Sequence, residues 1–239
     1  MAETYFDLQP GRMLGSNYEV IEFLGSGYEG EVYKVEERRT GIIRAAKLFF
    51  TRKGAREVPV LRYARKMYKL STCPILIQYH HRDSTKIKGE TVEFLVSDFA
   101  DGEMLSNYLS RKRGKRLPPF EALHMLYALA SGIEQIHLLG HYHGDIHSDN
   151  VMVRRVGLSY DVRLLDFFDH GRSNREKIQN DVYHLIDLLY EMIGGAEGYR
   201  KAPQNVRDII KGRKWSLVRK KFQTAAHLRM ALEKLEWDD

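Results

Sequence analysis

The chain has 239 residues, 43% of them hydrophobic, which is enough for one large domain or two small lobes and excludes a globally disordered chain. A single cysteine, Cys73, excludes an internal disulfide framework, and no stretch is apolar and long enough to span a membrane, so a cytoplasmic location is expected. The net charge of +6 fits either a solvated surface or an acidic partner, whereas nucleic acid is weakly supported because few aromatic residues lie within the basic runs.

The first hundred residues are predicted to be rich in strands. β-Branched and aromatic residues bounded by turn residues predict strands over residues 18–24, 31–35, 42–50, 78–81 and 91–99. Helical spacing of apolar residues, with many Lys and Arg between them, predicts one helix over residues 58–70. Residues 83–89 are predicted to form a polar turn.

A glycine-rich segment separates the first two predicted strands. Gly25, Gly27 and Gly30 occupy positions one, three and six, a spacing that lets backbone amides approach phosphate oxygens closely. A dinucleotide site uses the same spacing but needs a helix after the last glycine, and here a strand follows instead. The remaining alternative is an ordinary glycine-rich hairpin turn.

The third predicted strand carries Lys47. A lysine on a buried strand is costly unless it is paired, so an ion pair or a phosphate is expected beside it. Glu57 is the only acidic residue between Lys47 and Asp83 and is therefore the local candidate for that pair. A glutamate favoured by the helix dipole at the start of the next helix is an equal alternative.

Beyond Gly102 the chain is predicted to be mainly helical. Apolar periodicity predicts helices over residues 104–109, 120–139 and 181–193, two or three more over residues 205–236, and a small hairpin over residues 151–155 and 162–167. A strand-rich lobe is thus expected to meet a helix-rich lobe near residues 98–102, with a ligand between them.

The segment from His143 to Asn150 reads His-Gly-Asp-Ile-His-Ser-Asp-Asn and follows the long predicted helix. It resembles the catalytic loop of the protein-kinase-like superfamily, in which His-x-Asp is followed by four residues and Asn. The resemblance implies that Asp145 orients and deprotonates an acceptor hydroxyl and that Asn150 holds Mg²⁺. Asp166, in Leu-Asp-Phe after a predicted strand, resembles the second family aspartate and would also hold Mg²⁺. By itself Asp166 would be read as a strand-end cap.

The resemblance covers about residues 18–193 and implies an α+β, two-lobed protein-kinase-like fold that uses ATP and Mg²⁺. An N-terminal extension (1–17) would precede an antiparallel β-sheet N-lobe (18–97), a hinge (98–102) and a helical C-lobe (103–239). By the same resemblance Lys47 and Glu57 would orient the ATP phosphates, and Asp181 would brace the catalytic-loop backbone. The residues implied in adenine binding are Asp98 and Ala100, through their backbone, and Val32, Ala45 and Met152, on either side of the base.

Departures from the family pattern shape the expected function. Gly144 stands where phosphorylation-activated members have Arg, Phe168 replaces a Gly, and only 14 residues separate Asp166 from Asp181. A full activation segment does not fit there, so we expect a site that does not depend on loop phosphorylation. The glycine-rich loop and hinge resemble those of eukaryotic-like bacterial Ser/Thr kinases.

The His-Gly-Asp-x-His pattern is similar to aminoglycoside and choline phosphotransferases and to RIO-type kinases. The expected function is therefore a compact, bacterial or atypical protein Ser/Thr kinase acting on a protein substrate. A small-molecule kinase and a nucleotide-binding pseudokinase scaffold remain alternatives. The triplet His81-Arg82-Asp83 spells the family's catalytic triplet more literally, but Lys88 stands where Asn is needed, so we interpret it as a surface loop.

Overall fold

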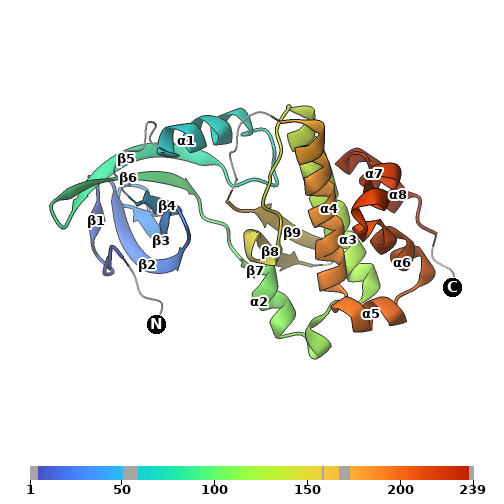
Figure 1. Ribbon diagram of the computed structural model, residues 1–239. Helices are drawn as coiled ribbons and strands as arrows, with labels where there is room; N and C mark the ends of the chain where they lie inside the picture. Colours follow the sequence, from blue (N-terminus) through green and yellow to red (C-terminus); the bar gives the residue numbers. More distant parts are fainter. Residues whose placement is uncertain (1–4, 51–58, 158, 167–172, 237–239) are drawn as a thin grey trace. The chain divides into compact units, whose positions relative to one another are not determined.

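A computed structural model describes residues 5–50, 59–157, 159–166 and 173–236 (Figure 1). The chain divides into two compact units. Unit 1 comprises Met1–Thr72 and Ile77–Ala100, and unit 2 comprises Cys73–Leu76 and Asp101–Asp239. In the described residues no helix has the length and apolar character needed to cross a membrane.

Unit 1 is an antiparallel sheet with one helix. Its six strands lie in the order β1-β2-β3-β4-β6-β5, and every pairing is antiparallel. Figure 1 shows the strongly twisted sheet, with α1 packed by β5 and β6. The elements are β1 (Met13–Leu14), β2 (Tyr18–Ser26), β3 (Gly30–Glu37), β4 (Ile42–Phe49), α1 (Pro59–Lys69), β5 (Tyr79–Ile87) and β6 (Glu90–Asp98).

Alternation along the strands builds the core of unit 1. In β3, Tyr33 and Val35 are fully buried, whereas Lys34 between them and Glu36 after them are more exposed. These two residues pack with Leu48 of β4 and Phe94 of β6 in one apolar cluster. The same cluster includes Phe6, Leu8 and Leu14, so residues of the segment expected to be an N-terminal extension are part of the unit 1 core.

The hairpin of β5 and β6 corrects two sequence predictions. The predicted polar turn over residues 83–89 is strand as far as Ile87, and the turn itself is only Lys88 and Gly89. Both residues have positive φ, 50° and 86°, as a two-residue hairpin turn matched to strand twist requires. The triplet at residues 81–83 is therefore in an edge strand rather than a surface loop. Edge strands tolerate polar side chains, so most of β5 lacks the apolar alternation that predicts a strand.

Unit 2 is mainly helical, with one small three-stranded sheet in the order β7-β8-β9. The α+β class and the division of the chain into a sheet unit and a helical unit are as predicted. The elements are β7 (Glu103–Met104), α2 (Leu105–Ser110), η1 (Arg113–Lys115), α3 (Pro119–Leu138), η2 (Ser148–Asn150), β8 (Val151–Val156), β9 (Ser159–Leu164), α4 (Arg175–Met192), α5 (Gly195–Lys201), α6 (Gln204–Ile210), η3 (Lys211–Arg213), α7 (Trp215–Lys221) and α8 (Ala225–Glu233).

Two long helices, α3 and α4, form the centre of unit 2 and lie side by side (Figure 1). A Cβ on Gly132 of α3 would lie 2.4 Å from Ile75, so glycine permits the segment 73–76 to approach the helix. Helix α4 begins at Arg175, six residues before the predicted start, because Asn174 caps it by accepting a hydrogen bond from the Lys177 amide at 2.9 Å. The first turn of α4 is polar, so the sequence has no apolar periodicity there that would predict this earlier start.

Candidate active site

The predicted catalytic loop, residues 143–150, lies between α3 and β8, and a buried carboxylate holds its backbone in place. Asp181 of α4 is fully buried and accepts hydrogen bonds from the backbone N–H groups of His143 (2.7 Å) and Gly144 (2.8 Å). The His137 ring nitrogen Nε2 lies 3.0 Å from the same carboxylate. Two amides that donate to one anion form a strong, directional anchor. Asp181 thus braces the loop as the sequence resemblance implied.

His143 links the catalytic loop to the end of β9. Its Nδ1 accepts from the Asp145 amide at 3.3 Å, which leaves the hydrogen on Nε2 to donate to the Leu165 carbonyl at 3.0 Å. The side chain is completely buried. The imidazole therefore serves as a structural cross-link with a defined tautomer.

Asp145 and Asn150 lie together in this loop. The Asn150 amide nitrogen donates to the backbone carbonyl and to the carboxylate Oδ2 of Asp145, both at 2.9 Å. Asn150 is 8% exposed, whereas the Asp145 side chain is 45% exposed. The Asn150 amide nitrogen thus holds the accessible Asp145 carboxylate in a fixed orientation, and the Asn150 carbonyl oxygen takes no part in these two hydrogen bonds. His147 Nε2 lies 3.6 Å from the other carboxylate oxygen.

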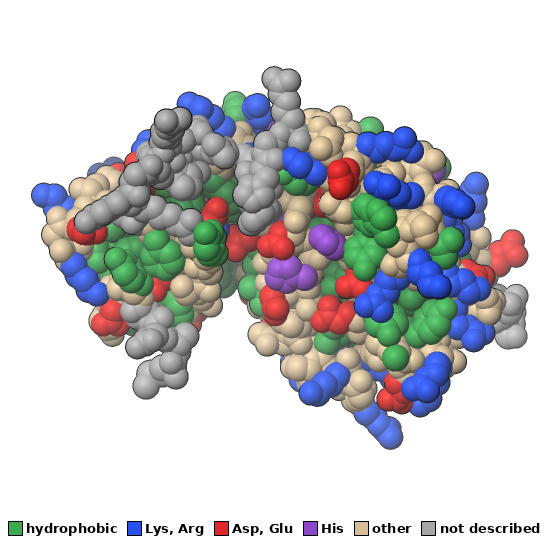
Figure 2. All heavy atoms as spheres, in the orientation of Figure 1, with side chains coloured by type: hydrophobic (Ala, Val, Ile, Leu, Met, Phe, Trp, Pro, Cys, Tyr) green, Lys and Arg blue, Asp and Glu red, His purple; other side chains and the backbone are tan. Residues whose placement is uncertain are grey.

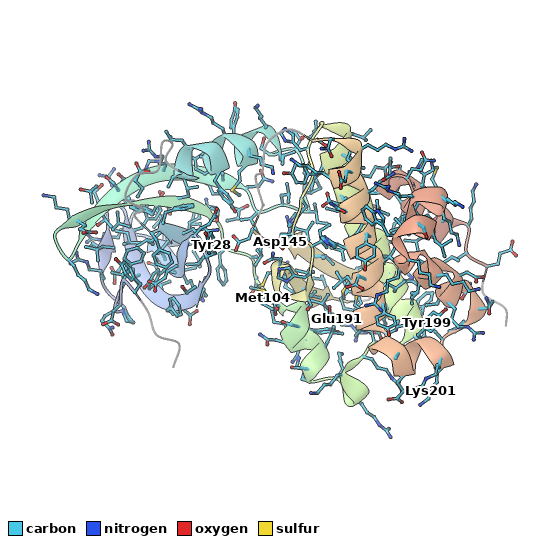
Figure 3. All side chains as sticks on the ribbon, in the orientation of Figure 1. Tyr28, Met104, Asp145, Glu191, Tyr199 and Lys201 are labelled. Atoms are coloured by element: carbon cyan, nitrogen blue, oxygen red, sulfur yellow. The ribbon has the colours of Figure 1, made fainter. Side chains whose placement is uncertain are left out.

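A contact between Ser148 and Glu191 was not predicted from the sequence. The Ser148 hydroxyl donates to the Glu191 carboxylate at 2.6 Å and joins the catalytic loop to the last turn of α4, where Figure 3 labels Glu191. The two residues are 43 positions apart and belong to no shared motif. Sequence spacing alone therefore gives no signal for this second anchor.

Asp166 follows β9 in a strained backbone conformation. Its φ is 42°, in the left-handed region that residues with a Cβ rarely adopt. The Leu165 amide just before it donates to the Asn150 carbonyl at 2.9 Å. This hydrogen bond links the backbone of Asn150, one predicted metal ligand, to the residue just before Asp166, the other predicted ligand. Strain of this kind is typical of functional positions. Phe168 lies outside the described residues.

The glycine-rich loop of unit 1 connects β2 to β3. The Gly27 amide donates to the Gly30 carbonyl at 2.9 Å and closes the loop. A Cβ on Gly30 would lie 1.9 Å from the Leu48 carbonyl oxygen of β4, so this glycine is required by the sheet. Cβ atoms on Gly25 and Gly27 would meet nothing within 4 Å. Gly30 is therefore needed for the close approach of β3 to β4, whereas Gly25 and Gly27 border open space.

Lys47 of β4 lies next to the glycine-rich loop. Its ammonium group is 3.2 Å from the Glu29 carboxylate and lies over the rings of Phe49 (5.6 Å) and Tyr63 (5.0 Å). The Lys47 side chain is 14% exposed. Lys47 was expected beside an ion-pair partner or a phosphate, and the structure shows an ion pair with Glu29, a residue that was not predicted as its partner. Glu57 lies outside the described residues, and its pairing with Lys47 stays a prediction.

The residues expected around adenine belong to both units. Val32 faces Lys47 across the β3–β4 ladder, Ala45 faces Ser97, and Met152 of β8 faces Met104. Both backbone groups of Asp98 already take part in hydrogen bonds, because its amide donates to the Gln78 carbonyl (2.9 Å) and its carbonyl accepts from the Ser97 hydroxyl (3.3 Å).

The Asp98 side chain belongs to a polar cluster on unit 1. Its carboxylate lies 2.6 Å from Arg44 and 2.5 Å from His80, and this cluster was not predicted. The roles of Asp98 and Ala100 in adenine binding stay predictions.

An antiparallel sheet with a glycine-rich loop and a strand lysine, followed by a helical unit with a braced Asp–Asn loop, defines the architecture of the kinase class. The family model described as "Protein kinase domain" matches residues 18–216. The chain belongs to this family, which confirms the resemblance drawn from the catalytic loop.

Named relatives agree with this assignment. A putative cyclin-dependent kinase F-2 of Oryza sativa subsp. japonica is 30% identical over 153 residues, which are 63% of this chain and 46% of that protein. A probable serine/threonine-protein kinase of Streptomyces coelicolor is 26% identical over 67% of this chain and 23% of its own length. The chain therefore spans less than half the length of these two relatives.

The fold is also that of a solved kinase domain. The crystal structure of the Mycobacterium tuberculosis PknI kinase domain aligns with a TM-score of 0.69 over 95% of this chain and 99% of that domain, at 20% identity. At this identity the likeness establishes the fold.

Proposed function

We propose that this chain is a Mg-ATP-dependent protein Ser/Thr kinase, with Asp145 as the residue that receives the proton of the acceptor hydroxyl. The observation that carries the proposal is the accessible Asp145 carboxylate, held by the Asn150 amide in a loop that Asp181 braces. Phosphoryl transfer depends chiefly on positioning and charge stabilisation, so a fixed carboxylate suits the task better than a strong base.

The donor chemistry of unit 2 fits magnesium. Both hydrogen bonds from the Asn150 amide nitrogen run to Asp145, which keeps the Asn150 carbonyl oxygen as an acceptor, and Asp166 supplies a carboxylate. Hard oxygen ligands of this kind are those that Mg²⁺ prefers. Asn150 and Asp166 would hold the ion, and Mg²⁺ would supply charge neutralisation at the phosphate oxygens.

The chemical step moves one phosphoryl group and one proton. The acceptor oxygen forms a bond to the γ-phosphorus as the bond from that phosphorus to the bridging oxygen of ATP breaks, and ADP leaves with the electron pair. The hydroxyl proton passes to the Asp145 carboxylate. Lys47 would place a positive charge beside the phosphates, and Gly25 and Gly27 would allow backbone amides to approach them.

The test is phosphate transfer from radiolabelled ATP with Mg²⁺ to the chain itself and to a generic protein acceptor. Asp145→Ala should reduce transfer at least about a hundredfold, the usual contribution of positioned acid–base groups. Asp149→Ala is the matched control, because its exposed side chain lies in the same loop. Equal activity of wild type and Asp145→Ala would reject the proposed role.

A small-molecule kinase is the second candidate. It is favoured by His147, whose Nε2 lies 3.6 Å from Asp145 in the His-Gly-Asp-x-His pattern. Alcohols, sugars and aminoglycosides should be offered as acceptors beside protein. Efficient turnover of one metabolite, without transfer to protein, would replace the first proposal.

We also propose that the protein substrate is acidic and contacts the C-terminal helices of unit 2. Figure 2 shows Lys and Arg side chains gathered there around apolar ones. A hollow of about 400 Å³ is lined by Asp208, Lys211, Leu217, Lys220 and Lys221. Leu217 is 40% exposed, and in the described part of the chain Lys220 has no acidic partner.

An apolar residue between acidic ones fits this hollow best. A phosphate backbone has no apolar side chain to place against Leu217, and a concave site does not suit a membrane surface. A fluorescein-labelled peptide with one Leu among Asp and Glu should bind, and Lys220→Glu should weaken binding about fivefold, since a single exposed charge pair is worth under about 1 kcal/mol. Arg113→Glu is the matched control. Preference for single-stranded RNA or for anionic vesicles would contradict an acidic peptide.

A further inference from the structure

The glycine-rich loop brings a negative charge to the residue proposed to bind phosphate. Glu29 follows Tyr28, the labelled residue of this loop in Figure 3, and its carboxylate Oε2 lies 3.2 Å from Lys47 Nζ. We infer that Glu29 is a displaceable counter-ion of Lys47 that lowers the affinity of the chain for nucleotide phosphates. The inference rests on the proposed function, because it takes Lys47 as a phosphate-binding residue.

The two partners differ in how freely they can move. Lys47 is 14% exposed, stands within a paired strand and lies over two aromatic rings, so its ammonium group has few alternative positions. The Glu29 carboxylate is 41% exposed and belongs to a loop. When another anion takes Lys47, Glu29 is therefore the partner that leaves.

The backbone of Glu29 keeps its side chain close to the loop glycines. Its carbonyl accepts a hydrogen bond from the Phe50 amide at 2.9 Å, just beyond the end of β4. The neighbouring Gly27 and Gly30 are joined by their own backbone hydrogen bond. The carboxylate can swing into solvent, but its attachment point stays beside the position where phosphates would lie.

Electrostatics gives the direction of the effect. Without nucleotide, Glu29 compensates a cation that is mostly removed from water, which is favourable. With a triphosphate at Lys47, the Glu29 carboxylate would lie near several negatively charged phosphate oxygens and would repel them. Neutralising Glu29 removes both the competition for Lys47 and the repulsion, so phosphate binding should tighten.

Glu29→Gln is the direct test, because it removes the charge and keeps the shape of the side chain. Isothermal titration calorimetry should give a Kd for Mg-ATP about three- to tenfold lower than wild type, the range expected for one partly exposed charge pair plus relief of repulsion. Adenosine, which has no phosphate, should bind both proteins equally. The gain for Mg-ATP should shrink in 1 M salt, where screening acts within about 3 Å.

Glu90→Gln is the matched control. Glu90 is exposed and faces Ile87 beside the hairpin turn, five residues along β6 from Leu95, which faces Lys47. The substitution removes the same charge and should leave both Kd values unchanged. Equal tightening in Glu90→Gln would show a general charge effect and overturn the inference, as would unchanged or weaker Mg-ATP binding in Glu29→Gln.

The two proposals fail differently in this experiment. Wild-type binding of Mg-ATP with no change in Glu29→Gln rejects the role of Glu29 and leaves the proposed kinase function standing. Absence of Mg-ATP binding by the wild type rejects both.

Discussion

Replacing Asp181 with Asn tests how the catalytic loop is held. The wild-type carboxylate is fully buried and receives two backbone N–H groups, from His143 at 2.7 Å and from Gly144 at 2.8 Å. Asparagine keeps one oxygen for one of these amides but presents an NH₂ group to the other. Two donors then face each other in a site without water access, so one backbone N–H loses its partner.

The expected cost is large for a substitution of two nearly isosteric residues. A hydrogen bond to a charged group contributes ~1.5–3 kcal/mol, and a buried unsatisfied donor costs a further ~1–3 kcal/mol. Asp181→Asn should therefore lower the free energy of unfolding by about 3 kcal/mol or more. Asp187→Asn on the same helix should cost less than about 1 kcal/mol, because the pair of Asp187 with Arg213 is exposed on both sides.

Urea unfolding followed by tryptophan fluorescence measures both variants in the relevant unit, since Trp215 of α7 belongs to unit 2. The slope of the free energy with urea should stay at the wild-type value, so that the shift in midpoint reports stability alone. Phosphate transfer should fall in Asp181→Asn and persist in Asp187→Asn. If the two variants differ by less than about 0.5 kcal/mol, the brace contributes little and the reasoning fails.

Three further outcomes are expected. Gly132→Ala should cost a net ~1–2 kcal/mol in urea unfolding, because overlap with Ile75 outweighs the better helix propensity of alanine, and a stabilised variant would contradict this. Burial and the hydrogen bond to Glu31 raise the pKa of Tyr33 above its ordinary value of 10.0. The contribution of Tyr33 to the free energy of unfolding is therefore fully present below pH 10 and decreases as the pH rises above that value. Between pH 9 and pH 11 the thermal midpoint should fall less in Tyr33→Phe than in wild type, and an equal fall would refute this expectation. Burial raises the pKa of the Cys73 thiol, so Ellman's reagent at pH 8 should react slowly with native protein and rapidly in urea, and fast native reaction would count against this.

The sequence predicted the elements whose apolar residues repeat, and it failed where polar residues fill an element. Helix α3 has nine buried positions in helical register, so its pattern was plain. Strand β5 reads Tyr-His-His-Arg-Asp-Ser-Thr-Lys-Ile and is held by backbone pairing with β6, which side-chain patterns do not encode. The early start of α4 depends on the Asn174 cap and likewise has no apolar signature.

The candidate site shows the same division. Asp145, Asn150, Asp166 and Asp181 could be proposed from the sequence because their spacing along the chain is itself the motif, and the roles of Asp145, Asn150 and Asp166 stay predictions. Glu29 could not, although it lies within a motif, because its position carries no fixed residue type. Its contact with Lys47 depends on how the loop folds back toward β4.

The glycine at position 144 illustrates how geometry explains a departure from the family pattern. Its φ is 88°, a left-handed conformation that glycine adopts without steric cost and that costs other residues roughly 1 kcal/mol or more. The conformation is what lets two successive amides, of His143 and Gly144, point at the one carboxylate of Asp181. Because Gly144 adopts this conformation without strain, the hydrogen bonds of Asp181 stabilise the loop without having to offset a backbone penalty.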